Sequence, residues 1–317
     1  MKAYLIKRLL QLIFLLAAVA TIVFFLVHFI PGDPAAFILG EFASTEDINR
    51  LHHQLNLDKP LAYQYIKFIK NLSDGSLGES LYDGHSVSQS ILAVLPYTIY
   101  LSLAAMSLAL LVSFPLGIWA AWRENTFSDA AVTLFSAIGL AIPNFFLGPL
   151  LIVLFSVKLK WLPVSGTEGL KSIVLPALTL ATSMCALLTR IIKTSLATEQ
   201  KKPYVLLAQA KGLSSYEILR HFLLKNAMIP IVTTVGLQLG ALLTGTVITE
   251  TVFSRPGIGS LLMTAIHRRD YPMVQGIVVF ITFVYLLFSF LVDMSYFFLD
   301  PRIGYEIKNK HYKQTNV

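Results

Sequence analysis

Long apolar runs alternate with short polar segments along most of this chain. Six of the runs are long enough, at 1.5 Å of rise per helical residue, to cross about 30 Å of hydrocarbon. They cover roughly residues 9–30, 97–121, 131–157, 173–196, 229–253 and 274–299. The pattern therefore predicts an all-α integral membrane protein with six transmembrane helices.

The composition agrees with a membrane location. Hydrophobic residues make up 55% of the chain and charged residues only 14%, whereas soluble domains average about 25% charged residues. The first apolar run is longer than the roughly 7–15 residues of a secretory signal core, so we expect it to remain as a span. The one cysteine, Cys185, excludes an intrachain disulfide framework and a cysteine-built metal site.

Proline and glycine occur inside several predicted spans. Such residues are tolerated where a span packs on neighbouring helices, and the small residues of the fifth span favour close helix contact. Kinks also line solute paths, although packing alone explains them at least as often. The residues concerned are Pro115, Gly117, Pro143, Gly148, Pro176, Gly236, Gly240 and Gly245.

Ionisable groups within the spans are few. Asp293 is the main one, and Glu250, Arg190 and Lys193 stand near span ends. A proton pump or ion-coupled carrier generally needs intramembrane charges along its route, so one mid-span acid gives that class little support. We expect Asp293 to pair with a polar group on a neighbouring helix rather than with a solute. The candidate pathway or helix-packing residues are Pro143, Asn144, Gly240, Glu250 and Asp293.

Basic residues are distributed unevenly between the two sides of the predicted spans. Of the 25 Lys and Arg residues, fifteen lie in the N-terminus, residues 122–130, residues 190–227 and the tail after residue 300. The positive-inside rule places these segments, and both termini, in the cytoplasm. This distribution explains the net charge of +7 better than binding of nucleic acid does.

Residues 31–95 are acidic and rich in turn-forming residues. Helical patterns over residues 45–55 and 60–72 predict two short amphipathic helices in this segment. Loops of such length are usually functional, although acidic residues in a solvated loop also serve solubility alone. His52 and His53 stand near two acids, but adjacent histidines on a helix point in different directions, so we do not expect a metal site.

Residues 204–230, here called the shelf, form the longest polar and basic segment between apolar runs. Pro203 suits the first turn of a helix that runs to about Lys211, and Gly212 suits a left-handed stop. The shelf therefore begins with a short helix that ends at a sharp turn.

A second helix is predicted after that turn. Ser214 and Glu217 have the spacing of a capping box, and Leu213 and Ile218 that of a hydrophobic staple. Pro230 is placed to open the next helix. Two short helices separated by a glycine turn form a compact folded unit. A segment that only linked two spans would not need such a structure.

Motifs of enzymatic chemistry are absent from the sequence. The chain has no G-x-x-x-x-G-K-[ST] phosphate loop, no H-E-x-x-H and no G-x-S-x-G. We therefore expect no catalytic residues, no metal site and no cofactor. A shelf of rigid helices, on a membrane protein without its own energy source, suggests a docking surface for a partner.

The shelf resembles the cytoplasmic coupling loop of importer-type ABC permeases. Residues 208–213, Ala-Gln-Ala-Lys-Gly-Leu, are similar to the A-x-A-K-G-L variant of the dipeptide and oligopeptide branch, the dipeptide permease B-like branch. His221, Asn226, Ala227 and Pro230 continue that pattern. Leu207 stands at a place that is often basic, and the Glu of the general E-A-A motif is absent.

The resemblance extends over nearly the whole chain. Any one of the matching segments is weak evidence, whereas their order along the chain is specific. Lys193 departs from the pattern, because an Arg is frequent at that place. The segments are residues 31–34, 55–58, 64–65, 78–80, 143–145, 161–166, 250–253, 269–272, 274–276 and 300–302.

The resemblance implies a type I ABC importer permease fold with a large extracytoplasmic loop between the first two helices. It divides the chain into a first helix with its loop (residues 1–94), a permease domain (95–306) with a coupling loop (197–228), and a cytoplasmic tail (307–317). It assigns to the ATPase-coupling loop Tyr204, Ala208, Ala210, Lys211, Gly212, Leu213, Glu217, Arg220, His221, Asn226 and Pro230.

The implied mechanism uses energy supplied by partner subunits. Two homologous permease subunits pair in the bacterial inner (plasma) membrane, each resting on a cytoplasmic ABC ATPase, and an extracytoplasmic binding protein delivers the solute. ATP binding closes the ATPases, and the coupling helices transmit that movement. In this interpretation Lys211 and Arg220 meet acceptors on the ATPase, and the acidic loop either engages the binding protein or guides the solute.

The solute is not fixed by these residues. The branch imports dipeptides, oligopeptides, glutathione, and nickel or its chelates, and peptides are its commonest substrates. Two other classes compete with this interpretation. A secondary transporter would show two matching repeats, which the sequence lacks, and a membrane-anchored scaffold would have unbroken Leu-rich spans.

Overall fold

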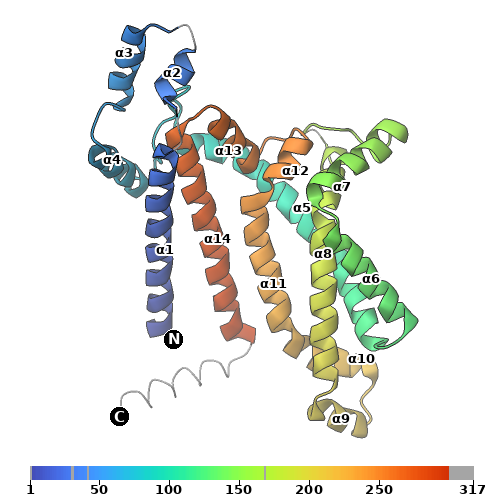
Figure 1. Cartoon of the computed structure of the whole chain (residues 1–317). Helices are drawn as coiled ribbons and strands as arrows, with labels where there is room; N and C mark the ends of the chain where they lie inside the picture. The colour runs from blue at the N-terminus through green and yellow to red at the C-terminus, as the bar shows by residue number, and fades with distance from the viewer. Residues whose placement is uncertain (1, 30–31, 41–42, 168, 300–317) are drawn as a thin grey trace, which may run out of the picture. The chain divides into compact units, whose positions relative to one another are not determined.

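The computed structural model describes residues 2–29, 32–40, 43–167 and 169–299 of the 317-residue chain. The described residues are mainly helical (Figure 1), with one isolated antiparallel bridge between Glu79 and Ser86. The predicted cytoplasmic tail, residues 307–317, lies outside them. The elements are α1 (Lys2–His28), α2 (Pro34–Leu39), α3 (Thr45–Leu55), α4 (Leu61–Ser73), α5 (Val87–Trp122), α6 (Phe127–Ala141), α7 (Asn144–Leu151), η1 (Ile152–Lys158), α8 (Lys171–Gln200), α9 (Pro203–Ala210), α10 (Ser215–Ile218), η2 (Leu219–Leu223), α11 (Leu224–Gly245), α12 (Val247–Val252), α13 (Ile258–His267) and α14 (Tyr271–Leu299).

The apolar runs form the helices that the sequence predicts. Among the described residues, five helices are long and apolar enough to cross a membrane, and a bent pair of helices makes a sixth span if it is counted as one. The five are α1, α5, α8, the helix that joins α10 to α11, and α14. This arrangement confirms the predicted all-α membrane fold.

The third predicted span is sharply bent. Helix α6 ends at Ala141, and the α7–η1 helix leaves at 97° to it. The bend falls before Pro143, where Ile142 has ψ of 116°, because a proline disfavours the helical conformation of the residue preceding it. With 15 residues, α6 rises only about 22 Å, which is less than the hydrocarbon thickness.

The second helix of the shelf is longer than the sequence analysis predicts. It starts at Ser215, passes through the π-helical turn η2 and continues as α11 to Gly245. Pro230 lies inside α11, so the prediction that it opens a new helix is wrong. Apolar packing of the continuous helix overrides the local preference of a proline that lacks an N–H donor.

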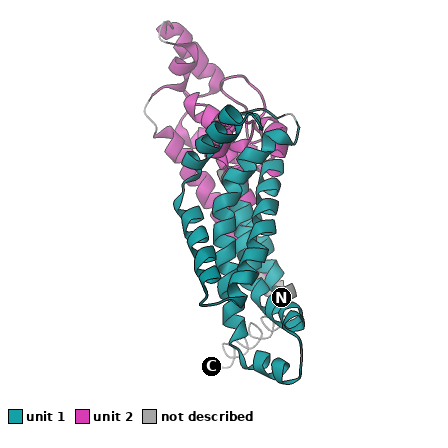
Figure 2. Cartoon of the chain, turned by 90° about the vertical axis from the view of Figure 1, so that its right-hand side faces the viewer, with its two compact units in different colours: residues 1, 100–242, 286–317 teal, residues 2–99, 243–285 magenta. Residues whose placement is uncertain are grey.

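The chain divides into two compact units (Figure 2). Unit 1 contains residues 100–242 and 286–299 of the described chain, and unit 2 contains residues 2–99 and 243–285. The division into residues 1–94, 95–306 and 307–317 stays a prediction.

Helix α8 is the centre of unit 1. Its Leu188, Ile192 and Leu196 are buried in a cluster with residues of α5, α9, η2 and α11. Ion pairs add to this packing: Lys193 of α8 pairs with Asp129, and Lys201 pairs with Glu124 (Nζ to Oε1, 2.8 Å). These contacts hold α8 to α6 and to the turn before it.

Unit 2 shows that the acidic segment is folded. Helices α3 and α4 confirm the two short helices predicted at residues 45–55 and 60–72. Phe68 of α4 packs against Phe24 of α1 and Val279 of α14. His52 contacts Asp33 whereas His53 contacts Asp58, each at 2.8 Å between nitrogen and oxygen, so the two adjacent histidines do point to different partners.

Candidate functional site

The turn of the shelf has the geometry that its sequence predicts. Lys202 is extended (ψ 147°), Pro203 opens α9, and the helix ends at Ala210. Gly212 then has φ of +80°, a left-handed conformation that costs an L-residue with a side chain about 1–2 kcal/mol. A Cβ atom at Gly212 would meet nothing within 4 Å. The backbone conformation, rather than crowding, therefore favours glycine at this turn.

The start of the second shelf helix is closed by a complete capping box. Glu217 N donates to Ser214 Oγ (3.3 Å), and Ser214 N donates to Glu217 Oε2 (2.8 Å). Ser214 Oγ also donates to Glu217 Oε2 (2.7 Å), and the donations from this hydroxyl and from Ser214 N hold the pKa of the Glu217 carboxyl below its ordinary value. Ile218 is buried in the core of unit 1, and Leu213 packs against the same cluster, as the predicted staple requires.

A polar network that the sequence analysis missed joins α9 to the helices on either side. Tyr204 Oη of α9 donates to Glu199 Oε2 at the end of α8 (2.6 Å), and Asn226 Nδ2 of α11 donates to Tyr204 Oη (3.0 Å). Lys202 Nζ donates to the other oxygen of Glu199 (2.6 Å). Burial, with the neighbouring Glu199 carboxylate, raises the pKa of Tyr204 to about 12.

This network fixes the angle of α9 against two long helices. Glu199 is buried, unlike most acids. One sequence feature could have indicated this network: residues 190–227 contain only two acids, Glu199 and Glu217, and seven basic residues. The capping box uses Glu217, which left Glu199 in need of a partner.

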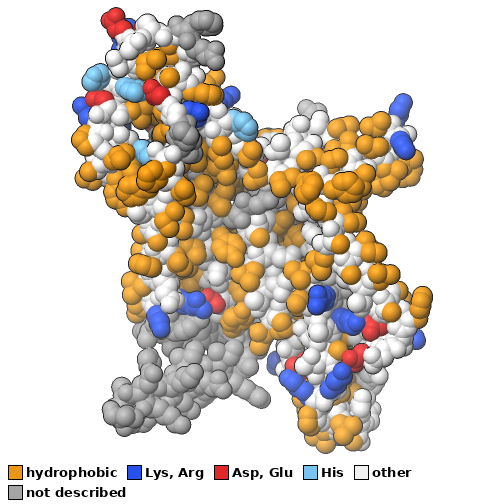
Figure 3. Space-filling model, viewed as in Figure 1, with side chains coloured by type: hydrophobic (Ala, Val, Ile, Leu, Met, Phe, Trp, Pro, Cys, Tyr) orange, Lys and Arg blue, Asp and Glu red, His pale blue; other side chains and the backbone are white. Residues whose placement is uncertain are grey.

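Apart from the polar network, the shelf has exposed apolar side chains. Leu206 and Leu207 of α9 are 72% and 58% exposed, and Tyr216 of α10 is 66% exposed. Figure 3 shows apolar side chains at this end of unit 1, with Lys and Arg side chains beside them. Contiguous exposed apolar surface rimmed by polar residues marks interaction sites. We call Leu206, Leu207 and Tyr216 the shelf patch.

The remaining predicted shelf residues divide between the core and the surface. Ala208 is buried within the chain's own core, whereas Ala210 is exposed. Lys211, Arg220 and His221 are exposed as well. The ring of His221 contacts the carbonyl of Glu217 one turn earlier (Nδ1 to O, 3.2 Å). Pro230 is exposed on α11, away from the turn.

The predicted pathway or packing residues lie on several elements. Pro143 and Asn144 form the bend between α6 and α7, and Ser183 Oγ of α8 donates to Asn144 Oδ1 (3.4 Å). Gly240 is buried in α11, and Asp293 is partly buried in α14. Their role in a pathway stays a prediction.

Glu250 occupies a buried polar cluster in unit 2. It is only 1% exposed, and its carboxylate accepts from Thr98 Oγ1 (2.8 Å), Thr246 Oγ1 (2.7 Å) and Ser260 N (3.0 Å). Arg255 is buried in the following loop, and burial lowers its pKa while the Glu250 carboxylate opposes that shift. These contacts favour helix packing as the role of Glu250. We call Thr98, Thr246, Glu250, Arg255 and Ser260 the Glu250 cluster.

Close packing around Glu250 also explains a glycine. A Cβ atom at Gly257 would lie 2.1 Å from Glu250 Oε1, so only glycine allows the chain to pass the carboxylate at this distance. Within the described residues, no group of three or more His, Cys, Asp or Glu side chains could hold a metal ion.

A multi-span helical fold of this kind is the arrangement of a membrane transport protein. The comparison with protein families agrees. Residues 113–305 match the binding-protein-dependent transport system inner membrane component family, and residues 1–104 match the N-terminal model of such membrane components. The chain belongs to this family and is a transmembrane permease subunit of an ABC importer.

Two curated relatives and one solved structure illustrate the match. A probable peptide ABC transporter permease protein of Sinorhizobium fredii is 37% identical, over 96% of this chain and 100% of the relative. The glutathione transport system permease protein of Escherichia coli K12 is 38% identical, over 96% and 99%. An inward-facing MetNI methionine ABC transporter has a TM-score of 0.55 at 16% identity, covering 66% of this chain and 96% of its own, which is a likeness of fold.

Proposed function

We propose that this permease forms, with a second homologous permease subunit, a pathway for di- or oligopeptides across the bacterial inner membrane. The support is that one relative is named for peptides and another for glutathione, itself a peptide-like compound. Nickel or its chelates are the alternative cargo, and no contact among the described residues favours them.

The shelf docks a cytoplasmic ABC ATPase in this proposal. The observation that carries it is the shelf patch, an exposed apolar surface on a helix whose angle is fixed by Gly212, by the capping box and by Tyr204. A rigid helix seated in a groove transmits movement, whereas a flexible loop would dissipate it. ATP-driven closure of the ATPases would therefore reach α8 and α11 through the shelf.

The proposed orientation places both termini and the shelf in the cytoplasm. The distribution of Lys and Arg supports this orientation. Residues 31–95 then lie outside, where the folded helices α2, α3 and α4 would form a cap that meets the solute-binding protein.

Reconstitution tests the proposed function. The permease, its partner permease and the ATPases are reconstituted in liposomes, and the binding protein is added. Uptake of tritiated trialanine is then measured with ATP supplied either on the side of the bilayer that the shelf faces or on the opposite side. We expect uptake that depends on ATP and is competed by unlabelled peptides. Uptake of nickel but not of any peptide or glutathione would contradict the peptide assignment.

A further inference from the structure

A pocket in unit 2 has no role in the function described so far. Its volume is about 480 Å³, within the range of small-molecule sites. The pocket lies between α4, the end of α1, the start of α14 and the loop before α5. Because all of its lining belongs to unit 2, its shape is set within one compact unit.

Segments that are distant in the sequence converge on this pocket. Five of the family-like segments identified in the sequence contribute to its wall: residues 55–58, 64–65, 78–80, 269–272 and 274–276. Docking of a cap onto the membrane helices does not by itself require a cavity between them. The convergence of these segments on one cavity therefore suggests that the cavity binds a ligand.

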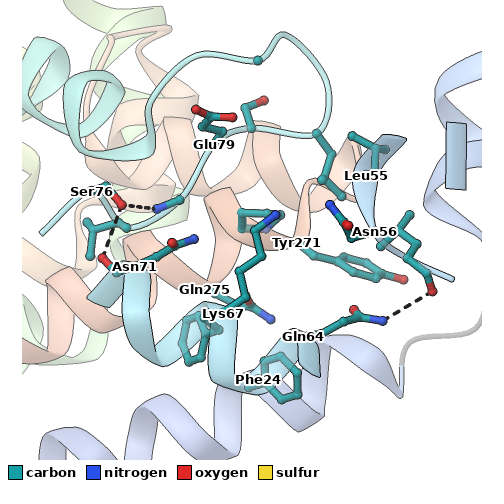
Figure 4. A pocket seen from close by; sticks show the side chains of 18 of the residues that line it. Phe24, Leu55, Asn56, Gln64, Lys67, Asn71, Ser76, Glu79, Tyr271 and Gln275 are labelled. Atoms are coloured by element: carbon teal, nitrogen blue, oxygen red, sulfur yellow. Dashed lines mark hydrogen bonds between the residues drawn. The ribbon is translucent and has the colours of Figure 1, made fainter. Parts of the chain in front are cut away.

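One buried donor in the wall has no partner. Gln275 of α14 is 4% exposed, and among the residues that the structure describes its Nε2 has no hydrogen-bond acceptor. An unsatisfied buried polar group lowers stability, so such a group calls for a partner such as a ligand or an ordered water. Gln275 lines the pocket, and Figure 4 shows it there together with Lys67.

Two side chains of opposite charge are among the residues that line this space. Figure 4 shows Lys67 extending from α4 into the pocket, and Glu79 on the loop above it. Within the described part of the chain, neither side chain forms an ion pair or a side-chain hydrogen bond. By contrast, His28 and Gln64 on the same wall already bond to each other (Nε2 to Oε1, 3.1 Å).

The chemistry of the lining narrows the ligand class. One lysine and one glutamate match a molecule with one negative and one positive end, and a polyanion would need more cations. The rings of Phe24, Phe68 and Tyr271 add apolar surface to the wall of the pocket. Amide and hydroxyl groups such as Asn71 and Ser76 complement peptide bonds.

We propose that this pocket binds a small zwitterionic, peptide-like solute, with Lys67 and Gln275 holding its carboxylate and Glu79 facing its ammonium group. The proposal rests on the peptide function and on the outward orientation proposed above. It gives the cap a direct solute contact, in addition to any contact with the binding protein.

Equilibrium binding to the purified complex of both permeases and the ATPases, without the binding protein, tests the site. The probe is tritiated trialanine, and the same peptide with an acetylated N-terminus and an amidated C-terminus is the uncharged comparison. We expect the wild-type complex to bind free trialanine at least about tenfold more tightly than the blocked peptide, because hydrogen bonds to charged groups are stronger than those between neutral groups.

Variants of the pocket assign the contacts. Lys67→Met and Glu79→Gln should each weaken trialanine binding about tenfold or more, and Gln275→Leu should weaken it about fivefold. Lys70→Met is the matched control, because Lys70 lies on the same helix, is exposed and does not line the pocket. It should bind as wild type does. Lys67 and Glu79 are exposed side chains, so their variants are expected to fold.

Several outcomes would overturn the inference. One is wild-type affinity in Lys67→Met and Glu79→Gln; others are no trialanine binding by the wild type, or equal binding of the blocked peptide. If Lys67→Met lowers the affinity of the complex for the solute-binding protein but leaves trialanine binding unchanged, the pocket is a contact site for that protein instead. ATP-driven trialanine uptake separates the two proposals, since uptake without pocket binding refutes the site alone, and absence of all peptide uptake refutes the function.

Discussion

The shelf in unit 1 and the Glu250 cluster in unit 2 are both rigid, but contacts of different range hold them. The capping box of the shelf joins residues three positions apart, and Tyr204 bonds to Glu199 five positions away. In the cluster, Thr98 bonds to Glu250 across 152 positions of sequence. The shelf exposes apolar side chains, whereas the cluster buries charged ones.

This difference agrees with the proposal that the shelf docks a partner, whereas the Glu250 cluster holds helices together. Short-range contacts shape the turn and the helix starts of the shelf, and Tyr204 and Asn226 then hold α9 against α8 and α11. The Glu250 cluster exists only when α5, α12 and α13 have packed. Changes in the cluster should therefore affect folding first, and changes in the shelf should affect coupling first.

The largest effect is expected from Glu250→Ala. It leaves buried donors of Thr98, Thr246 and Ser260 without their acceptor, and removal of one partner from a buried charged network costs about 3–5 kcal/mol. Thermal unfolding of the purified complex should show a clearly lower Tm and a lower yield. Thr251→Ala, at an exposed position on the same helix, is the control. Equal Tm values would show that the cluster does not hold the fold.

Tyr204→Phe should have the next largest effect. It removes the donor to the buried Glu199 carboxylate, a charged hydrogen bond of about 1.5–3 kcal/mol. We expect less solute transported per ATP hydrolysed, with membrane insertion unchanged. Unchanged coupling would mean that the angle of α9 does not depend on this network.

The pH dependence of the same variant follows from the pKa of Tyr204, which folding raises from 10.0 to about 12. A group with a raised folded-state pKa contributes stability that is present below the unfolded pKa and lost as pH rises through the folded pKa. The difference in unfolding free energy between wild type and Tyr204→Phe should be constant from pH 6 to 9 and shrink above about pH 10. A marked change near pH 7 would contradict this assignment.

Gly212→Val is expected to cost about 1–2 kcal/mol, because a β-branched residue is strained at positive φ. That strain should shift the turn and lower ATP-driven uptake, while stability of the spans changes little. Gly212→Asn is the matched control, since asparagine tolerates the left-handed region. If the valine and asparagine variants transport equally, the left-handed turn is not needed for coupling.

The smallest effect is expected from exchanging exposed charges. Lys211→Glu with Arg220→Glu should weaken ATPase association a few-fold, since exposed ion pairs contribute about 0.2–1 kcal/mol each. The loss should diminish at high salt. Copurification of the ATPase with the permease measures this association, and Lys70→Glu in unit 2 is the control. Wild-type association at low salt would leave the shelf patch as the main contact.

The sequence predicted the spans and the turn of the shelf because both depend on local signals. Apolar runs, the Ser214–Glu217 spacing and Gly212 each act within a few residues, and the structure confirms them. It did not predict the 97° bend at Pro143 or the passage of a helix through Pro230. At Pro143 the local effect of the proline on the residue before it prevails, whereas at Pro230 the packing of the continuous helix overrides the proline.

The contacts of Glu199 and Gln275 could not be predicted, for a related reason. The scarcity of acids in residues 190–227 suggests that Glu199 has a partner, but it does not show that the carboxylate is buried beside Tyr204. Gln275 belonged to a family-like segment, but only the folded chain places its amide in a cavity with Lys67. Local patterns predict elements, whereas polar sites depend on how those elements meet.

Cross-linking from the shelf patch tests whether the shelf docks a cytoplasmic ABC ATPase. The native Cys185 is buried, so a thiol introduced by Leu207→Cys reports on an exposed position of α9, and Ala208→Cys places a thiol in the core as a control. We predict that the thiol at position 207 cross-links to the ABC ATPase in membranes, that the thiol at position 208 does not, and that a membrane-impermeant reagent added to intact cells modifies neither. Modification of position 207 from outside the cell would contradict the account.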